Sequence, residues 1–224
     1  MSASELKSDD LNKIVAGGEI ELIGKMPWSS NATFLAEATL GEHSARVIYK
    51  PHIGERPLWD FPDGLWKREV AAYELSDALG WDVVPFTIFR DDAPHGIGSV
   101  QRFIDADFEQ HYFTMLEDES THAQLQRMAA FDFVCNNTDR KGGHCLIDSD
   151  GHIWGIDNGL SFHAEFKLRT VIWDFGGEEI DDELLADVAD ALLAHAGDEV
   201  AEEERDDDVA VLHNGGAEEL DDDE

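Results

Sequence analysis

Two short polar segments near the middle of the chain place the strongest constraint on its fold and chemistry. The segment 137–144 contains Asp139, and the segment 156–159 contains Asp157, eighteen residues further on. A hydrophobic run precedes each aspartate and Asn or Gly stands close by, so we expect both carboxylates in loops after buried elements. One such carboxylate can accept a proton from an attacking hydroxyl, while the other can hold the metal that bridges nucleotide phosphates. The pattern favours a phosphoryl-transfer site.

The first half of the chain is typical of a meander of strands combined with helices. We expect helices over 5–16 and 65–79, and strands over 19–23, 33–40, 45–50, 83–90 and 99–104. The third strand ends at Lys50, and Glu69 lies in the second helix. A lysine at the inner end of a strand can reach nucleotide phosphates while a helix carboxylate holds it. The alternative is that both are surface charges, as most Lys and Glu are.

The second half predicts more helix and one hairpin. We expect helices over 123–135 and 181–195, and hairpin strands over 145–148 and 152–156. From residue 197 onward acidic residues dominate, and too few apolar residues remain to offset the entropy of ordering, which predicts a disordered tail. The expected divisions are therefore 1–104, 105–196 and 197–224.

The loop between the first two strands is a candidate phosphate-covering loop. Its position suits backbone N–H groups that contact phosphates, which would involve Ser29, Ser30 and Asn31. The loop lacks a strong Gly-rich signature, so an ordinary turn is the equal alternative.

The charge of the chain excludes one class of function. It carries 50 acidic and 16 basic residues, a formal net charge of −34, with no basic stripe to neutralise nucleic-acid phosphates. We interpret the dispersed acidity as halophilic, from a salt-rich haloarchaeal cytoplasm; an acidic mimic of nucleic acid is the alternative. No apolar run is long enough to span a membrane, and the N-terminus has no export signal, so a cytoplasmic location is expected.

Four segments, taken together, resemble the phosphatidylinositol 3-/4-kinase-like branch of the protein-kinase-like fold. The likeness is closest to the type II phosphatidylinositol 4-kinases, extends to a small prokaryotic family within that superfamily, and covers roughly residues 20–180. The segments that carry it are 47–51, 68–73, 131–140 and 155–162.

The resemblance implies an α+β, bilobal protein-kinase-like fold, with a small β-rich N-terminal lobe, a reduced helical C-terminal lobe and ATP between them. By matching position, Asp139 would be the catalytic aspartate, Asp157 the metal ligand, and Lys50 and Glu69 the phosphate-contacting pair. The strand 99–104 would lead into the hinge beside adenine, which adds Gln101 and Phe103 to the expected nucleotide site. From their position beside Asp139, Arg140 and Lys141 could keep that carboxylate ionised or engage phosphate oxygens.

One position departs from the family pattern. His144 stands five residues after Asp139, where the pattern carries a metal-binding Asn. Magnesium prefers oxygen ligands and imidazole suits softer ions, so His144 would weaken a second Mg²⁺ site, favour Mn²⁺ or contact phosphate.

The expected function is an ATP-dependent kinase acting on a hydroxyl of an unidentified protein or small polar molecule. The strong acidity argues against an inositol lipid at a membrane surface. Two alternatives remain: a catalytically silent nucleotide-binding module that regulates a partner, and an adenylyl transferase on the same scaffold. Neither the acceptor nor the oligomeric state can be read from the sequence.

The net charge generates a first prediction. At about 1 M salt the Debye length falls to about 3 Å, which mutes the repulsion among acidic side chains. The urea midpoint of unfolding should therefore rise steeply between dilute buffer and multimolar KCl. A protein that stays folded and active in dilute buffer would contradict the halophilic interpretation.

Overall fold

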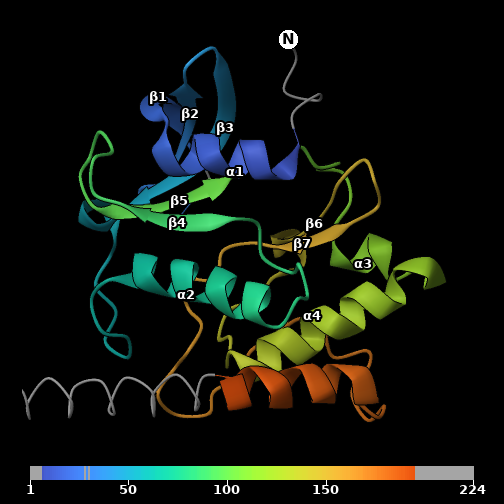
Figure 1. Cartoon of the computed structure of the whole chain (residues 1–224). Helices are drawn as coiled ribbons and strands as arrows, with labels where there is room; N and C mark the ends of the chain where they lie inside the picture. Colours follow the sequence, from blue (N-terminus) through green and yellow to red (C-terminus); the bar gives the residue numbers. More distant parts are fainter. Residues whose placement is uncertain (1–6, 28, 30, 195–224) are drawn as a thin grey trace, which may run out of the picture. The chain divides into compact units, whose positions relative to one another are not determined.

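A computed structural model describes residues 7–27, 29 and 31–194 of the chain (Figure 1). The chain divides into two compact units, Met1–Glu179 and Ile180–Glu224. The described part of the second unit is mainly a helix over 182–194. The division expected after residue 104 lies inside the first unit, and the tail expected over 197–224 lies outside the described residues.

A five-stranded sheet in the order β1-β2-β3-β5-β4 forms the N-terminal half of the first unit. All of its neighbouring strands are antiparallel. The strands are β1 (Glu19–Lys25), β2 (Phe34–Leu40), β3 (His43–Pro51), β4 (Thr87–Arg90) and β5 (Gly98–Arg102).

Side-chain alternation along β3 builds the core of this half. Ala45, Val47 and Tyr49 are buried on one face of the sheet, where they pack with Ile14 and Val15 of α1 (Ser8–Gly17). Helix α2 (Leu65–Ala78) joins β3 to β4 in the chain and packs against β4 and β5. Figure 1 shows α1 and α2 on opposite sides of these two strands. The end of β3 therefore comes close to α2.

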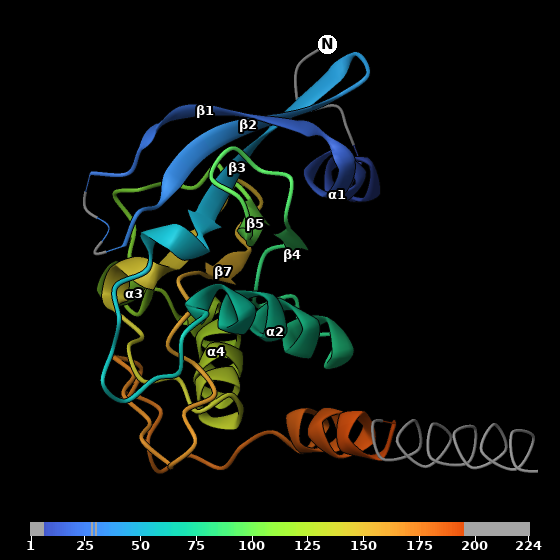
Figure 2. The same ribbon diagram turned by 90° about the vertical axis from the view of Figure 1, so that its left-hand side faces the viewer.

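The remaining part of the first unit is mostly helical with one hairpin. Its regular elements are α3 (Tyr112–Met115), α4 (His122–Val134), β6 (Cys145–Ile147) and β7 (Ile153–Gly155). In Figures 1 and 2 the β6–β7 hairpin lies between the five-stranded sheet and α4. The N–H of Gly155 donates to the carbonyl of Val83 at 2.7 Å, which connects the hairpin to the chain just before β4.

The α+β class expected from the sequence is confirmed. Helix α3 was not predicted, and the strand expected from residue 83 begins only at Thr87. The reason is that the N–H groups of Val83 and Val84 donate to Ser76 Oγ, at 2.8 and 3.1 Å, instead of to a neighbouring strand. Within the described ranges, no helix is long and apolar enough to cross a membrane.

The close pairing of β3 and β5 predicts that Gly98 tolerates no side chain. A Cβ at Gly98 would lie 2.4 Å from the Lys50 carbonyl oxygen and 2.8 Å from Pro51 Cα, both of them backbone atoms. Gly98→Ala should therefore lower the free energy of unfolding by about 1–3 kcal/mol, measured by denaturant titration.

Gly17→Ala is the matched control, because a Cβ there meets no atom within 4 Å and Gly17 ends a helix. It should leave stability unchanged or raise it by up to about 1 kcal/mol. Equal effects of the two substitutions would contradict the close approach at Gly98.

Candidate functional site

One cavity of about 290 Å³ brings together four of the ionisable residues that the sequence singled out. Lys50, Glu69, Asp139 and Asp157 all line it, although they come from four separate segments of the chain. The sheet places Lys50 at the end of β3, helix α2 supplies Glu69, and the two aspartates lie in loops after α4 and β7. The structure therefore brings these four predicted residues together.

Lys50 lies between two carboxylates in the cavity wall. Its Nζ donates to Glu69 Oε1 and, at 2.9 Å, to Asp157 Oδ1. Burial alone would lower the pKa of Lys50, but the charges of Asp157 and Glu69 outweigh burial and raise it. The Lys50 ammonium in turn lowers the pKa of Asp157, against the effect of burial. Both groups are therefore charged at neutral pH.

Glu69 also fixes the turn that carries Asp157. It is almost fully buried, and its two carboxylate oxygens accept the N–H groups of Asn158 and Gly159, each at 3.0 Å. Asp157 itself has φ of +59°, in the left-handed region that few residues other than Gly adopt. The same α2 side chain therefore holds both Lys50 and the backbone beside Asp157.

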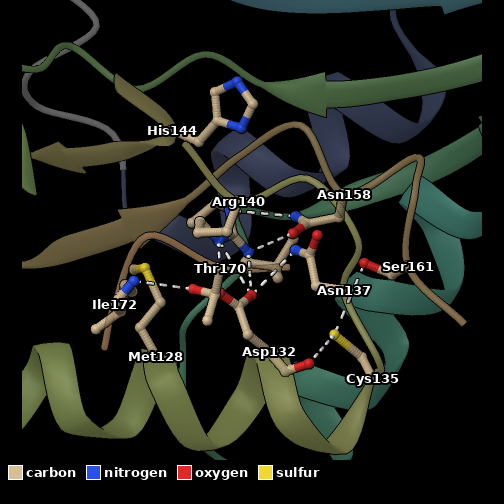
Figure 3. A network of polar contacts seen from close by, with 12 residues as sticks. Met128, Asp132, Cys135, Asn137, Arg140, His144, Asn158, Ser161, Thr170 and Ile172 are labelled. Carbon is tan, nitrogen blue, oxygen red and sulfur yellow. Dashed lines mark hydrogen bonds and ion pairs between the residues drawn. The ribbon is translucent and has the colours of Figure 1, made fainter. Parts of the chain in front are cut away.

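A buried ion pair connects the two aspartate loops (Figure 3). Arg140 Nη2 donates to Asp132 Oδ1 at 2.8 Å, and both side chains are fully buried. The guanidinium also donates to Asn158 Oδ1 at 2.7 Å and to the Ile156 carbonyl at 2.8 Å. Asp132 further accepts from Asn137 Nδ2 at 3.0 Å, so the Asp132–Arg140 pair anchors residues from both loops.

The position of Arg140 corrects one expectation. A fully buried guanidinium that is bound to Asp132, Asn158 and Ile156 cannot meet phosphate oxygens in the cavity. Burial would lower the pKa of Arg140, but Asp132 outweighs burial and raises it. Arg140 therefore acts by positioning the two loops.

Asp139 is held at the cavity wall by its neighbours. Its N–H donates to Asn137 Oδ1 at 2.9 Å, and its Oδ2 accepts from Lys141 Nζ at 2.6 Å. The carboxylate is about one-third exposed, so it can reach a bound molecule while its backbone stays fixed.

His144 lies next to Asp157, with its Nε2 3.4 Å from Asp157 Oδ2. Burial lowers the pKa of His144 although Asp157 opposes the shift, so the imidazole is neutral at neutral pH. A neutral imidazole nitrogen and a carboxylate oxygen at this separation can bind the same metal ion. Of these two donors, the carboxylate oxygen is the kind that Mg²⁺ and Mn²⁺ prefer, whereas an imidazole nitrogen suits softer ions.

The predicted phosphate-covering loop borders the cavity. Ser29 and Asn31 line it, and Ser30 lies outside the described residues. The hydroxyls of Ser29 and Thr33 bond to each other at 2.8 Å, while Asn31 Oδ1 accepts the N–H of Arg56 at 3.0 Å. Asn31 thus connects this loop to the segment after β3.

We call this segment, residues 52–64, the strap. Glu55 anchors it by accepting the N–H groups of Gly64, Leu65 and Trp66 at the N-terminus of α2. In the second half of the strap, Asp60 pairs with Lys167, which follows Asp157 in the chain. The strap therefore spans from the β1–β2 loop to the segment beyond Asp157.

Gln101 and Phe103 are not brought to the cavity. Gln101 is buried and its Nε2 donates to Thr87 Oγ1 at 2.8 Å, because its side chain faces the neighbouring strand β4. The Phe103 ring lies under the guanidinium of Arg46, 4.4 Å away. The sequence placed both residues beside adenine, and that expectation stays a prediction, because neither side chain lines this cavity.

Several site residues had no clear signal in the sequence. Asp132 lies within the helix expected over 123–135, and an aspartate between apolar residues there could have indicated a buried ion pair. Asn137 and Asn158 belong to the recognised segments, but their roles depend on contacts with Asp132 and Arg140. Arg56 was missed because no spacing rule places the strap over the cavity.

Fold and site together define a mixed α+β protein with a charged cavity between its sheet and its helical part. No family model matches the chain. The chain is 45% identical over 221 residues to Protein Rv2133c of Mycobacterium tuberculosis, an alignment that covers 82% of this chain and 79% of that protein. The chain therefore belongs to the same family as Protein Rv2133c.

The buried ion pair generates a stability prediction. Asp132→Asn keeps the shape of the side chain but leaves the Arg140 guanidinium without its counter-charge in the interior. The free energy of unfolding should fall by about 3–5 kcal/mol, measured by denaturant titration.

Lys13→Ala provides the comparison, because Lys13 and Asp10 form an exposed pair at 3.0 Å on α1. Its loss should cost less than about 1 kcal/mol. If Asp132→Asn unfolded at the same denaturant concentration as Lys13→Ala, the anchoring role of the buried pair would be wrong.

Proposed function

We propose that the protein is an ATP-dependent phosphotransferase with a bilobal protein-kinase-like fold. The observation that carries the proposal is the Lys50–Glu69 pair, with Asp139 and Asp157 lining the same cavity. Protein kinases use a lysine on the third strand, a glutamate on the following helix, a catalytic-loop aspartate and a metal-binding aspartate in these roles.

The topology supports the bilobal part of the proposal. Lys50 lies on the third strand, and the helix that carries Glu69 joins that strand to β4. The chain then continues from β5 into α3 and α4, and reaches Asp139 directly after α4. The ionisable residues thus follow the order that phosphoryl transfer on this scaffold requires.

Each ionisable group has a role that its surroundings favour. Asp139, with a fixed backbone and a partly exposed carboxylate, orients the acceptor hydroxyl and accepts its proton. Lys50, held by Glu69, neutralises phosphate oxygens. Asp157 and His144 would hold Mg²⁺ or Mn²⁺. The bound metal–ATP complex supplies the phosphoryl group and offsets the charge on its oxygens.

The cavity size indicates which part of the nucleotide it accommodates. At about 290 Å³ it is at the lower limit of typical ligand pockets, which start at about 300 Å³. Its lining is rich in ionisable groups, which suits phosphates and an acceptor group better than a purine ring. The acceptor is a hydroxyl of a protein or of a small polar molecule.

A silent nucleotide-binding module is the second candidate. The observation that favours it is the pairing of Asp139 with Lys141, at 2.6 Å, which occupies the carboxylate that would act as base. Adenylyl transfer on the same scaffold can be distinguished from both candidates, because it would transfer label from the α-phosphate of ATP and not from the γ-phosphate.

The test is transfer of radiolabel from ATP in multimolar KCl, with Mn²⁺ and Mg²⁺ compared, to the protein or to components of a cell extract. Label from the γ position should be transferred, and Asp139→Asn should reduce the rate by about 10²–10⁴-fold. Asp157→Asn should abolish metal-dependent transfer.

Asp150→Asn is the matched control, because Asp150 is exposed in the β6–β7 turn and does not line the cavity. It should transfer label at the wild-type rate. ATP binding without transfer would favour the silent module, label from the α position would favour adenylyl transfer, and absence of binding would overturn the nucleotide site.

A further inference from the structure

The described part of the cavity wall has three basic residues, Lys50, Arg56 and Lys141. Lys50 is paired with Glu69 and Asp157, and Lys141 is paired with Asp139. Among the described residues, none forms a hydrogen bond or ion pair with the guanidinium of Arg56. The positive charge of Arg56 is therefore not neutralised by a described carboxylate of the cavity.

The backbone of Arg56 is fixed although its side chain is exposed. Its N–H donates to Asn31 Oδ1 at 3.0 Å, and the carbonyl of the preceding Gly54 accepts the N–H of Ala32 at 3.0 Å. The intervening Glu55 caps the N-terminus of α2. The strap thus holds Arg56 at the place where the β1–β2 loop meets the cavity.

The β1–β2 loop itself is poorly equipped to bind phosphates through its backbone. It has no glycine between Lys25 and Thr33, and Pro27 lacks an N–H group. The N–H groups of Met26 and Ala32 donate to the carbonyls of Thr33 and Gly54. Kinases commonly cover the phosphates with a Gly-rich loop, and this chain offers a cation beside the loop instead.

We propose that Arg56 binds the terminal phosphates of the nucleotide, as a strap residue that takes over part of the task of a Gly-rich loop. The inference rests on the proposed function, because it assumes ATP in the cavity. A guanidinium suits this role because it can donate two parallel hydrogen bonds to one phosphate group. In a chain of net charge −34, an anchored arginine beside the cavity that has no ion-pair partner among the described residues is best explained by an anionic ligand.

The experiment is calorimetric titration of the full chain with ATP and with adenosine, in KCl and Mn²⁺. Arg56→Ala should weaken ATP binding by about tenfold or more, because charge-assisted hydrogen bonds are lost, and leave adenosine binding unchanged. Arg56→Lys should recover only part of the affinity, since an ammonium cannot reproduce the bidentate contact. Lys13→Ala, which removes one positive charge from α1, should bind ATP like the wild type.

The outcomes separate this inference from the proposed function. If the wild type binds ATP and transfers its γ-phosphate while Arg56→Ala binds ATP equally well, the inference alone is overturned. An equal loss of ATP and adenosine affinity would also overturn it, because Arg56 would then only support the strap. If the wild type does not bind ATP, both proposals fail.

Discussion

The buried pair between Asp132 and Arg140 is the interaction on which the site depends. Asp132 extends from α4, and Arg140 reaches from the loop after α4 to Asn158 in the loop after β7. Two charges are costly to bury, and the cost is offset here because their polar atoms are extensively hydrogen-bonded (Figure 3). The pair joins two loops, both rich in turn-forming residues, that carry Asp139 and Asp157 to the cavity.

Glu69 also connects separate segments of the chain at the cavity. It accepts hydrogen bonds from Lys50 on β3 and from the backbone of Asn158 and Gly159. The Glu69 carboxylate therefore connects strand β3, helix α2 and the loop after β7. This arrangement explains why the charged residues of the cavity keep a fixed geometry despite the large negative charge of the chain.

Much of the fold could be predicted from the sequence, because strands and helices here have clear apolar periodicity and turn residues between them. The grouping of Lys50 with Asp139 and Asp157 was also predictable from their order and spacing. The side-chain direction of Arg140 was not, because sequence cannot show which of two adjacent cations, Arg140 or Lys141, turns inward. The contact of Gln101 was unpredictable for a related reason, since its side chain bonds to Thr87 on the neighbouring strand β4.

The backbone of Asp157 combines conformational strain with the placement of a charged group at one residue. Its φ of +59° places an L-residue in a conformation that glycine adopts without strain, at a cost of about 1–2 kcal/mol for most side chains. Glycine at this position would relax the turn but would remove the carboxylate that faces Lys50 and His144. Glycine would thus lower the backbone strain but leave Lys50 with one carboxylate partner instead of two. Aspartate is among the few residues other than glycine that tolerate this conformation, and here it also supplies a carboxylate to Lys50 and His144.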